Sequence, residues 1–316
     1  MKRVLVTGGS GLIGSPAVLA LARAGWEVHA VARQPGAIVK RVRWHAVDLL
    51  APGAGRRLID DVRPSHLLHL AWCTDSPGHL SSPVNHRWRE TGSELVHAFA
   101  SAGGRRAVVA GSCVEYDWSR ERERLSEAQT PIIPSYDYGR AKDALRREVE
   151  DLAAATGLEM AWGRIFFIYG PGDRASRLVS SLSRSLLSGE PISPPDGSRI
   201  RDFLFSVDAS EALVALLTSE VTGAVNIASG VPVSISEIAE ALASEAGRSD
   251  LLRPEAPARR SDEPRRLVAD VRRLRHEVGW RPAVPLREGL KRTLSWWHGQ
   301  LETLSGAAGA RSSQRP

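Results

Sequence analysis

The chain has 316 residues, of which 42% are hydrophobic and 25% are charged, and its formal net charge is +6. This composition is typical of a globular protein, and the length suits one large domain or two closely joined domains. No apolar run in the sequence is long enough to cross a membrane.

The start of the chain and its cysteines favour a cytoplasmic protein. Glycines interrupt the N-terminal apolar run too early for a signal peptide, and Cys73 and Cys113 give no disulfide framework. Basic residues are spread along the chain without interleaved aromatic residues, which argues against a nucleic-acid groove. The mild positive charge would still favour a phosphate-bearing substrate. We predict no nucleic-acid partner, no membrane partner and no metal site.

Strand and helix patterns alternate through the first half of the chain. This alternation predicts an α/β fold with a doubly wound parallel sheet, whose ligands bind at the carboxyl ends of the strands. Strands are predicted at 2–7, 27–32, 41–49, 65–72, 105–112 and 158–167, and helices at 16–25, 85–102 and 135–156.

A glycine-rich loop follows the first predicted strand. Gly8, Gly11 and Gly14 form G-x-x-G-x-x-G before the first helix, with Leu12 and Ile13 inside the motif. Glycines permit a tight turn and let a pyrophosphate approach backbone N–H groups at the helix N-terminus. At the first strand of an alternating chain, the motif predicts dinucleotide binding.

The end of the second predicted strand favours NADP(H) over NAD(H). NAD sites usually have a carboxylate there for the ribose 2′-hydroxyl, but this chain has Ala32 and Arg33. An arginine suits a 2′-phosphate, although an arginine stacked on adenine would be indifferent to that phosphate. Asp48 and Leu49, after the third strand, are expected to border the adenine pocket.

Tyr138 and Lys142 lie four residues apart on a predicted helix and therefore share a face. Tyr136 has Arg140 at the same spacing, and the charge of an arginine cannot be removed at ordinary pH. An ammonium near a phenol lowers the phenol pKa, so the Tyr138–Lys142 pair could move a proton to or from an alcohol or carbonyl oxygen. The alternative is an exposed tyrosine beside a solvated lysine.

Together, the motifs resemble those of the extended short-chain dehydrogenase/reductase family, in its NAD-dependent epimerase/dehydratase group acting on nucleotide sugars. The resemblance covers roughly residues 3–298 of the chain. It rests, in chain order, on TGGSGLIG, HLAW, AGSCVEY, YGRAK, GRIFFIYGPG, RDF, NIASG and GWRP.

The resemblance implies a catalytic trio. Tyr138 would be the acid/base, Lys142 would lower the pKa of Tyr138 and bind the nicotinamide ribose, and Ser112 would hydrogen-bond the substrate oxygen. Tyr136 would then line the pocket or pack. The remaining cofactor contacts, at the ends of predicted strands, are assigned to Leu70, Ala71 and Ile165.

On the substrate side the resemblance implies two arginines that grip a sugar-nucleotide diphosphate. They match Arg201 in RDF and Arg260 in RRSD, and arginine forks suit phosphate oxygens. A surface ion pair is the alternative for each arginine. Trp72, after the fourth strand, is expected either in the substrate-pocket wall or in the core.

The chain departs from its relatives at several positions. Cys113 and Val114 stand where sugar 4,6-dehydratases carry acids, so we do not expect elimination of water. Phe167 replaces an asparagine of many relatives and cannot donate a hydrogen bond to a diphosphate. Arg89 stands where relatives have another asparagine, and Asn85 lies one turn earlier. The GSCVEY segment is similar to 4-ketoreductases of deoxysugar pathways.

We expect residues 1–166 to form a Rossmann-like NADP(H)-binding domain. Residues 167–304 should form mainly a smaller substrate-binding domain, with some segments returning to the sheet. Residues 305–316 are rich in small and polar residues and predict a disordered tail.

These features favour an NADPH-dependent reductase of a nucleotide-linked 4-keto-6-deoxy sugar. A nucleotide-sugar epimerase that keeps its cofactor bound is the first alternative. Reduction of a carbonyl without a nucleotide and a non-catalytic NADP-sensing protein are the others. The resemblance also implies a homodimer that pairs through helices flanking the sheet, including the Tyr138 helix.

Overall fold

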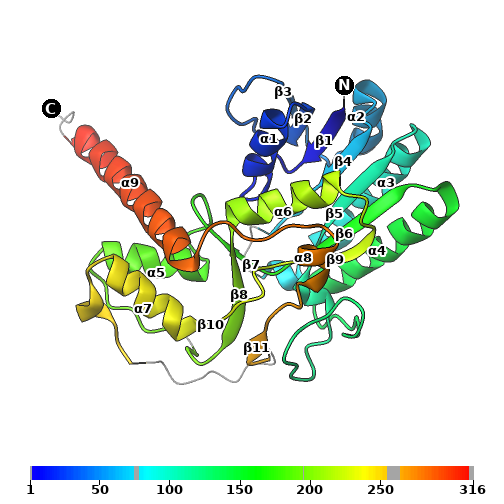
Figure 1. The fold of residues 1–316 in the computed structure, drawn as a ribbon. Helices are drawn as coiled ribbons and strands as arrows, with labels where there is room; N and C mark the ends of the chain where they lie inside the picture. Colours follow the sequence, from blue (N-terminus) through cyan, green and yellow to red (C-terminus); the bar gives the residue numbers. More distant parts are fainter. Residues whose placement is uncertain (1, 75–77, 195, 255–263, 313–316) are drawn as a thin grey trace.

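A parallel sheet forms the centre of the computed structural model, which describes residues 2–74, 78–194, 196–254 and 264–312 (Figure 1). Seven strands lie in the order β3-β2-β1-β4-β5-β6-β9, and every neighbouring pair is parallel. Their bounds are β1 Arg3–Thr7, β2 Glu27–Ala32, β3 Val42–Ala46, β4 His66–His69, β5 Arg106–Ser112, β6 Glu159–Ile165 and β9 Gly223–Ile227.

Helices cover both faces of this sheet. Two of them pack on one face and three on the other, so the strands are buried from both sides. The first face carries α1 Gly14–Arg23 and α6 Ser206–Thr218, and the second carries α2 Ala54–Val62, α3 Val84–Ser101 and α4 Asp137–Thr156.

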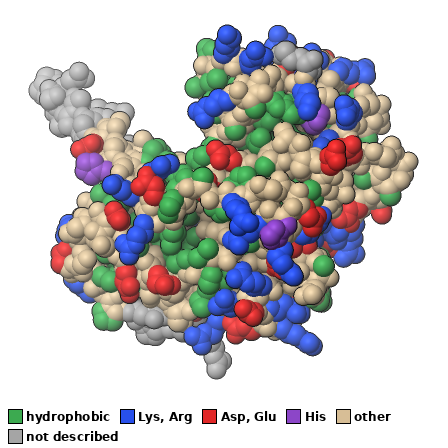
Figure 2. Space-filling model, in the orientation of Figure 1, with side chains coloured by type: hydrophobic (Ala, Val, Ile, Leu, Met, Phe, Trp, Pro, Cys, Tyr) green, Lys and Arg blue, Asp and Glu red, His purple; other side chains and the backbone are tan. Residues whose placement is uncertain are grey.

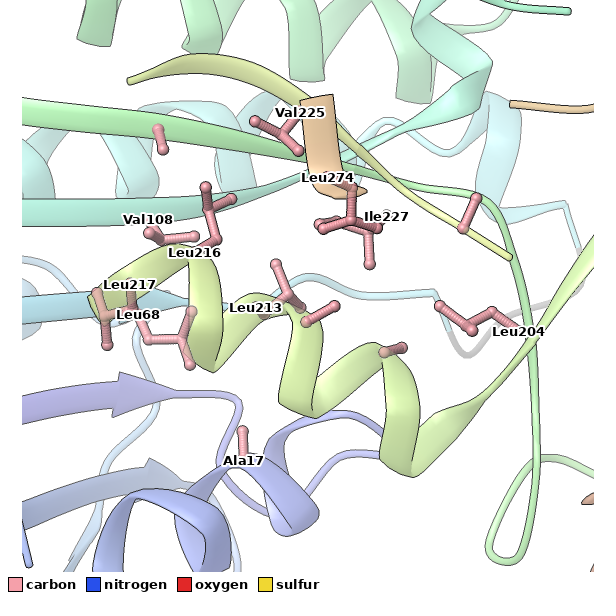
Figure 3. Close-up of a cluster of buried hydrophobic side chains, with 14 of the residues drawn as sticks. Ala17, Leu68, Val108, Leu204, Leu213, Leu216, Leu217, Val225, Ile227 and Leu274 are labelled. Atoms are coloured by element: carbon pink, nitrogen blue, oxygen red, sulfur yellow. The ribbon is translucent and has the colours of Figure 1, made fainter. Parts of the chain in front are cut away.

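The two cores follow from the alternation of side chains along each strand. Val4 and Val6 of β1 join the cluster under α1 and α6, whereas Leu5 joins the cluster under α2, α3 and α4. Figure 3 shows the first cluster, in which Leu213 of α6 lies between Ala17 of α1 and the sheet. This double packing fixes the strand ends, from which the site is built.

A smaller sheet lies beside the larger one in the second half of the chain. β8 pairs in parallel with β7 and β11 and antiparallel with β10, and α5, α7 and α9 contact one another next to it. The strands are β7 Phe167–Tyr169, β8 Ile200–Phe205, β10 Pro232–Ser234 and β11 Arg266–Leu267. The helices are α5 Leu178–Leu187, α7 Ile235–Glu245, α8 Arg272–His276 and α9 Leu286–Ser312, with single 3-10 turns at His79–Ser81, Cys113–Glu115 and Ser249–Leu251.

The predicted doubly wound α/β fold is confirmed, with three differences in its elements. The strand expected at 158–167 ends at Ile165, and the chain then enters the smaller sheet as β7. Helix α2 has no counterpart among the sequence predictions. The tail expected to be disordered is helical through Ser312, because its alanines favour the helix that α9 has already begun; residues 313–316 lie outside the described residues.

The visible surface carries mixed charge. Figure 2 shows Lys and Arg side chains interspersed with Asp and Glu, and hydrophobic side chains gathered between the upper part of the molecule and the part that carries α5 and α7. Within the described residues, no helix is both long and apolar enough to cross a membrane.

Candidate active site

One large pocket opens at the carboxyl ends of the parallel strands. Its volume is about 1510 Å³, and it runs from the β1–α1 loop to the smaller sheet. Arg260 lies outside the described residues. All other predicted site residues line this pocket: Gly8, Gly11, Leu12, Ile13, Gly14, Arg33, Asp48, Leu49, Leu70, Ala71, Trp72, Ser112, Tyr138, Lys142, Ile165 and Arg201.

The β1–α1 loop has the shape that a pyrophosphate requires. Gly8 has a φ of +69°, and a Cβ there would lie 2.9 Å from the Ala71 nitrogen. A Cβ on Gly14 would lie 2.0 Å from the Gly8 carbonyl oxygen, so only glycine fits. No side chain caps the N-terminus of α1 and no acid stands in its first turn, so the helix presents its positive end to the pocket.

Thr7 ties the glycine loop to the neighbouring strand. Its hydroxyl pairs with the His69 ring at 2.7 Å and accepts hydrogen bonds from the backbone N–H groups of Leu70 (3.1 Å) and Ala71 (3.2 Å). The end of β4 is therefore held against Gly8, which places Leu70 and Ala71 on the pocket wall.

Arg33 is the charged side chain at the end of β2, and it is exposed at the pocket. Asp48 is also exposed, and its carboxylate accepts a hydrogen bond from the Leu50 backbone N–H at 3.0 Å, while Leu49 is buried. The backbone turn after Asp48 therefore occupies one oxygen of its carboxylate. The Arg33 guanidinium lies in the part of the pocket that β1, β2 and β3 form.

Ser112, Tyr138 and Lys142 come together where β5 ends and α4 begins. Tyr138 lies in the first turn of α4, and its phenol lies beside the Ser112 side chain. The Lys142 ammonium donates to the Ala110 carbonyl oxygen at 2.7 Å and lies 5.9 Å from the centroid of the Tyr138 ring. All three side chains are buried, with Tyr138 9% exposed.

A buried carboxylate, which the sequence analysis did not assign, supports this trio. Glu115 is fully buried and accepts hydrogen bonds from the Ser112 backbone N–H (2.7 Å), the Trp162 indole (3.0 Å) and the Arg164 guanidinium (2.8 Å). The ion pair with Arg164 is also buried. Glu115 closes a capping box with Ser112, which holds the Ser112 hydroxyl at the end of β5.

The protonation expected for Tyr138 needs correction. Burial, reinforced by the Glu115 carboxylate, raises the pKa of Tyr138, and the hydrogen bond with Ser112 opposes this only in part. Burial also lowers the pKa of Lys142, and its ammonium is directed to Ala110 and Trp72. Desolvation therefore outweighs the expected lowering of the phenol pKa by Lys142, and the phenol is protonated at neutral pH.

Residues of β7 and β8 line the end of the pocket at which the substrate is expected. Arg201 is 3% exposed, and its guanidinium donates to the carbonyl oxygens of Ile200 (3.0 Å), Pro264 (3.1 Å) and Arg265 (3.1 Å). The same guanidinium lies 5.4 Å from the centroid of the Phe167 ring. Arg201 is therefore buried at this end of the pocket and does not lie on the surface.

Two further arginines reach this end of the pocket and were not among the predicted site residues. Arg174 donates to the Thr74 hydroxyl at 3.0 Å, and Arg177 is exposed at the start of α5. Within the described residues, the Arg177 side chain forms no hydrogen bond or ion pair in the structure. No local motif marks either residue, because the pocket forms only when α5 packs beside β8.

Comparison with known proteins agrees with this geometry. The sequence profile of the NAD-dependent epimerase/dehydratase family matches residues 4–228. The chain is 29% identical to a UDP-glucose 4-epimerase of Azospirillum brasilense, over 98% of this chain and 95% of that protein.

Two solved structures have the same fold. A Thermus thermophilus UDP-glucose 4-epimerase in complex with NAD has a TM-score of 0.81, with 26% identity, over 94% of this chain and 99% of that one. MoeE5 in complex with UDP-glucuronic acid and NAD also has a TM-score of 0.81, with 29% identity and the same coverage. The chain therefore belongs to the NAD-dependent epimerase/dehydratase family and is an NAD(P)-dependent oxidoreductase or epimerase of the extended short-chain dehydrogenase/reductase type.

Proposed function

We propose that this protein is an NADPH-dependent reductase of a nucleotide-linked 4-keto-6-deoxy sugar. The observation that carries the proposal is the composition of the pocket around Tyr138. Ser112, Tyr138 and Lys142 supply a proton relay, whereas Cys113 and Val114 stand at the two positions that hold acids in sugar 4,6-dehydratases. The site is thus equipped for hydride transfer with one accompanying proton and lacks carboxylates at those two positions.

The protonated phenol suits reduction. A bound nicotinamide cofactor would supply the hydride, and Tyr138 would donate its proton to the carbonyl oxygen, which becomes a hydroxyl. Ser112 would donate a hydrogen bond to the same oxygen and stabilise the negative charge that develops on it. A protonated Tyr138 holds the proton that reduction requires, whereas oxidation of an alcohol would first require the phenolate.

Arg33 supports the choice of NADPH. It is exposed at the end of β2, where an NAD site would have a carboxylate, and can pair with a 2′-phosphate.

We predict that Arg33→Ser weakens NADPH affinity about tenfold or more and leaves NADH affinity nearly unchanged, as isothermal titration calorimetry would show. Arg43→Ser is the matched control, because Arg43 is exposed on β3 away from the pocket-lining residues. Equal losses for both nucleotides would contradict this role of Arg33.

The proposed substrate is a sugar nucleotide. Arg201 would contribute to the diphosphate grip, assisted by Arg260, and Trp72 would lie near the sugar. The solved structure of MoeE5 with UDP-glucuronic acid supports this substrate class. Because Phe167 cannot donate a hydrogen bond, the exposed guanidinium of Arg177 would compensate for the missing amide.

The reductase is tested by mixing the purified protein with NADPH and a nucleotide-linked 4-keto-6-deoxy sugar and following NADPH absorbance. We expect NADPH to be consumed in proportion to the sugar, and Tyr138→Phe to slow the reaction at least about 100-fold. The Phe variant should still bind NADPH, which separates loss of the proton donor from loss of folding. Equal rates in both proteins would exclude Tyr138 as the acid.

A nucleotide-sugar epimerase is the second candidate, because the UDP-glucose 4-epimerases reported above align with nearly the whole chain. An epimerase oxidises and re-reduces one centre, so it would keep its cofactor and consume none. Protein that is purified with tightly bound NAD, inverts a UDP-hexose and leaves added NADPH unchanged would favour this candidate over the reductase.

We further propose that the protein acts in the cytoplasm as a homodimer paired through α3 and α4. These helices lie side by side on one face of the sheet. Sedimentation equilibrium should give twice the chain mass of 34.3 kDa, and a single monomer mass would exclude this assembly.

A further inference from the structure

An aromatic ring covers the ammonium of the proposed cofactor-binding lysine. The Lys142 nitrogen lies 3.8 Å from the centroid of the Trp72 ring, and Lys142 is only 2% exposed. An ammonium has three N–H donors, of which the Ala110 carbonyl takes one. Among the described residues no carboxylate forms an ion pair with Lys142. After the Ala110 carbonyl oxygen, the indole face is therefore the closest source of negative potential at this ammonium.

The indole itself is fixed from the side of α3. Its N–H donates to the Asn85 side-chain oxygen at 2.9 Å, and the fully buried Asn85 amide donates to the His79 carbonyl at 2.8 Å. The Trp88 ring stacks on Trp72 at a centroid distance of 6.3 Å. These contacts hold the Trp72 ring in place over the Lys142 ammonium.

Trp72 also touches the proton donor. Its ring meets Tyr138 edge-on, with ring centroids 6.0 Å apart and an interplanar angle of 85°. One indole thus contacts both Tyr138 and Lys142, which lie one turn apart on α4, and anchors them to α3 through Asn85.

We propose that Trp72 is a positioning residue that acts through Lys142. Its ring holds the ammonium charged and directed, so that Lys142 can bind the nicotinamide ribose. This inference rests on the proposed function, in which Lys142 binds the nicotinamide ribose. It gives Trp72 a role in supporting the cofactor, beyond the two places expected from the sequence, the substrate-pocket wall and the core.

The test is a double-mutant cycle on NADPH affinity, measured by isothermal titration calorimetry with Trp72→Leu, Lys142→Met and the double variant. A cation–π contact to a desolvated lysine predicts that Trp72→Leu weakens binding about 3- to 30-fold in the wild-type background. The same substitution should add no further loss once Lys142 is Met. Equal losses in both backgrounds, or no loss in the wild-type background, would overturn the proposal.

Two matched variants separate the π face from packing. Trp72→Phe keeps an aromatic face and should restore affinity to within about threefold of wild type, although it loses the Asn85 bond. Trp88→Leu removes the ring that stacks on Trp72, but the Asn85 hydrogen bond still holds the indole over Lys142, so affinity should fall less than in Trp72→Leu. A Phe variant as weak as the Leu variant would show that packing, rather than the π face, is responsible.

If Trp72→Leu does not fold, fluorinated tryptophan keeps the ring shape while it weakens the π face. Protein made with 5-fluorotryptophan throughout should bind NADPH more weakly than unlabelled protein, and the labelled and unlabelled Lys142→Met proteins should bind equally. A loss of the same size in both backgrounds would contradict the proposal. None of these binding measurements requires the sugar, so a failed reductase assay and a failed role for Trp72 are distinguishable.

Discussion

At the scale of single residues, the site combines a local motif with a long-range contact. Tyr138 and Lys142 share a face because helical spacing requires it, so the sequence could predict this pair. The same sequence could not show that Glu115 pairs with Arg164, 49 residues away, since the pairing depends on β5 and β6 lying side by side. It also could not show how strongly burial acts on Tyr138, because burial is a property of the assembled pocket.

The Glu115–Arg164 pair should be important for stability because both partners are buried. We predict that Glu115→Gln lowers the free energy of unfolding by about 3 kcal/mol, since it leaves the Arg164 guanidinium buried without a counter-charge. Urea unfolding followed by circular dichroism would measure this loss. Glu277→Gln is the control, because the exposed Glu277–Arg273 pair should contribute no more than about 1 kcal/mol. Losses of similar size in the two variants would refute the distinction.

At the scale of elements, segments in which the backbone admits only certain residues could be predicted from the sequence. Short segments that mix charged and apolar residues could not. The glycine spacing marked the β1–α1 loop, because only glycine fits beside the Gly8 carbonyl and Ala71. Helix α2 escaped prediction because it is nine residues long and carries several charges between its apolar positions. The division between β6 and β7 was also missed, because an unbroken apolar run does not reveal that its residues enter two different sheets.

The β1–α1 loop gives a prediction at this scale. Gly14→Ala should weaken binding of NADPH and NADH alike by about tenfold or more, because the added methyl group would clash with the Gly8 backbone. Fluorescence titration of each nucleotide would measure the loss. Gly299→Ala in α9 is the control, since a Cβ there meets no atom within 4 Å and should leave both affinities unchanged. Wild-type affinity in Gly14→Ala would mean that the dinucleotide does not bind at this loop.

At the scale of the whole molecule, the two-sided packing of the parallel sheet determines where chemistry is possible. The alternation of strands and helices was sufficient to predict the doubly wound sheet and the strand ends as the site. The substrate end was predicted less completely, because it depends on α5 and β8 meeting the sheet from a distant part of the chain. Arg174 and Arg177 reached the pocket in this way and carry no sequence signal of their own.

Buried histidines should make the fold sensitive to acid. Burial, helped by Lys2, Arg105 and Arg106, lowers the pKa of His66 to about 4. The unfolded chain takes up a proton near the ordinary histidine pKa of about 6.5, whereas the folded chain does so only near 4. Stability is therefore full above about pH 6.5 and decreases as the pH falls toward 4.

We predict that the free energy of unfolding falls by about 1 to 3 kcal/mol because of His66 between those limits. Urea unfolding at a series of pH values would show the decrease. His66→Gln should reduce its slope, and His298→Gln, at an exposed position on α9, should not. An unaltered slope in His66→Gln would contradict this origin of the acid sensitivity.

The central claim is that free NADPH delivers a hydride to a keto sugar in this pocket. Its most direct test uses NADPH that carries deuterium at the transferring position, with a nucleotide-linked 4-keto-6-deoxy sugar, and mass and NMR analysis of the product. We predict one deuterium on the carbon that bore the keto group, and incorporation at least about 100-fold slower when Tyr138→Phe replaces the wild type. Turnover of a nucleotide sugar without any deuterium in the product would contradict the reductase and indicate an epimerase that recycles its own bound cofactor.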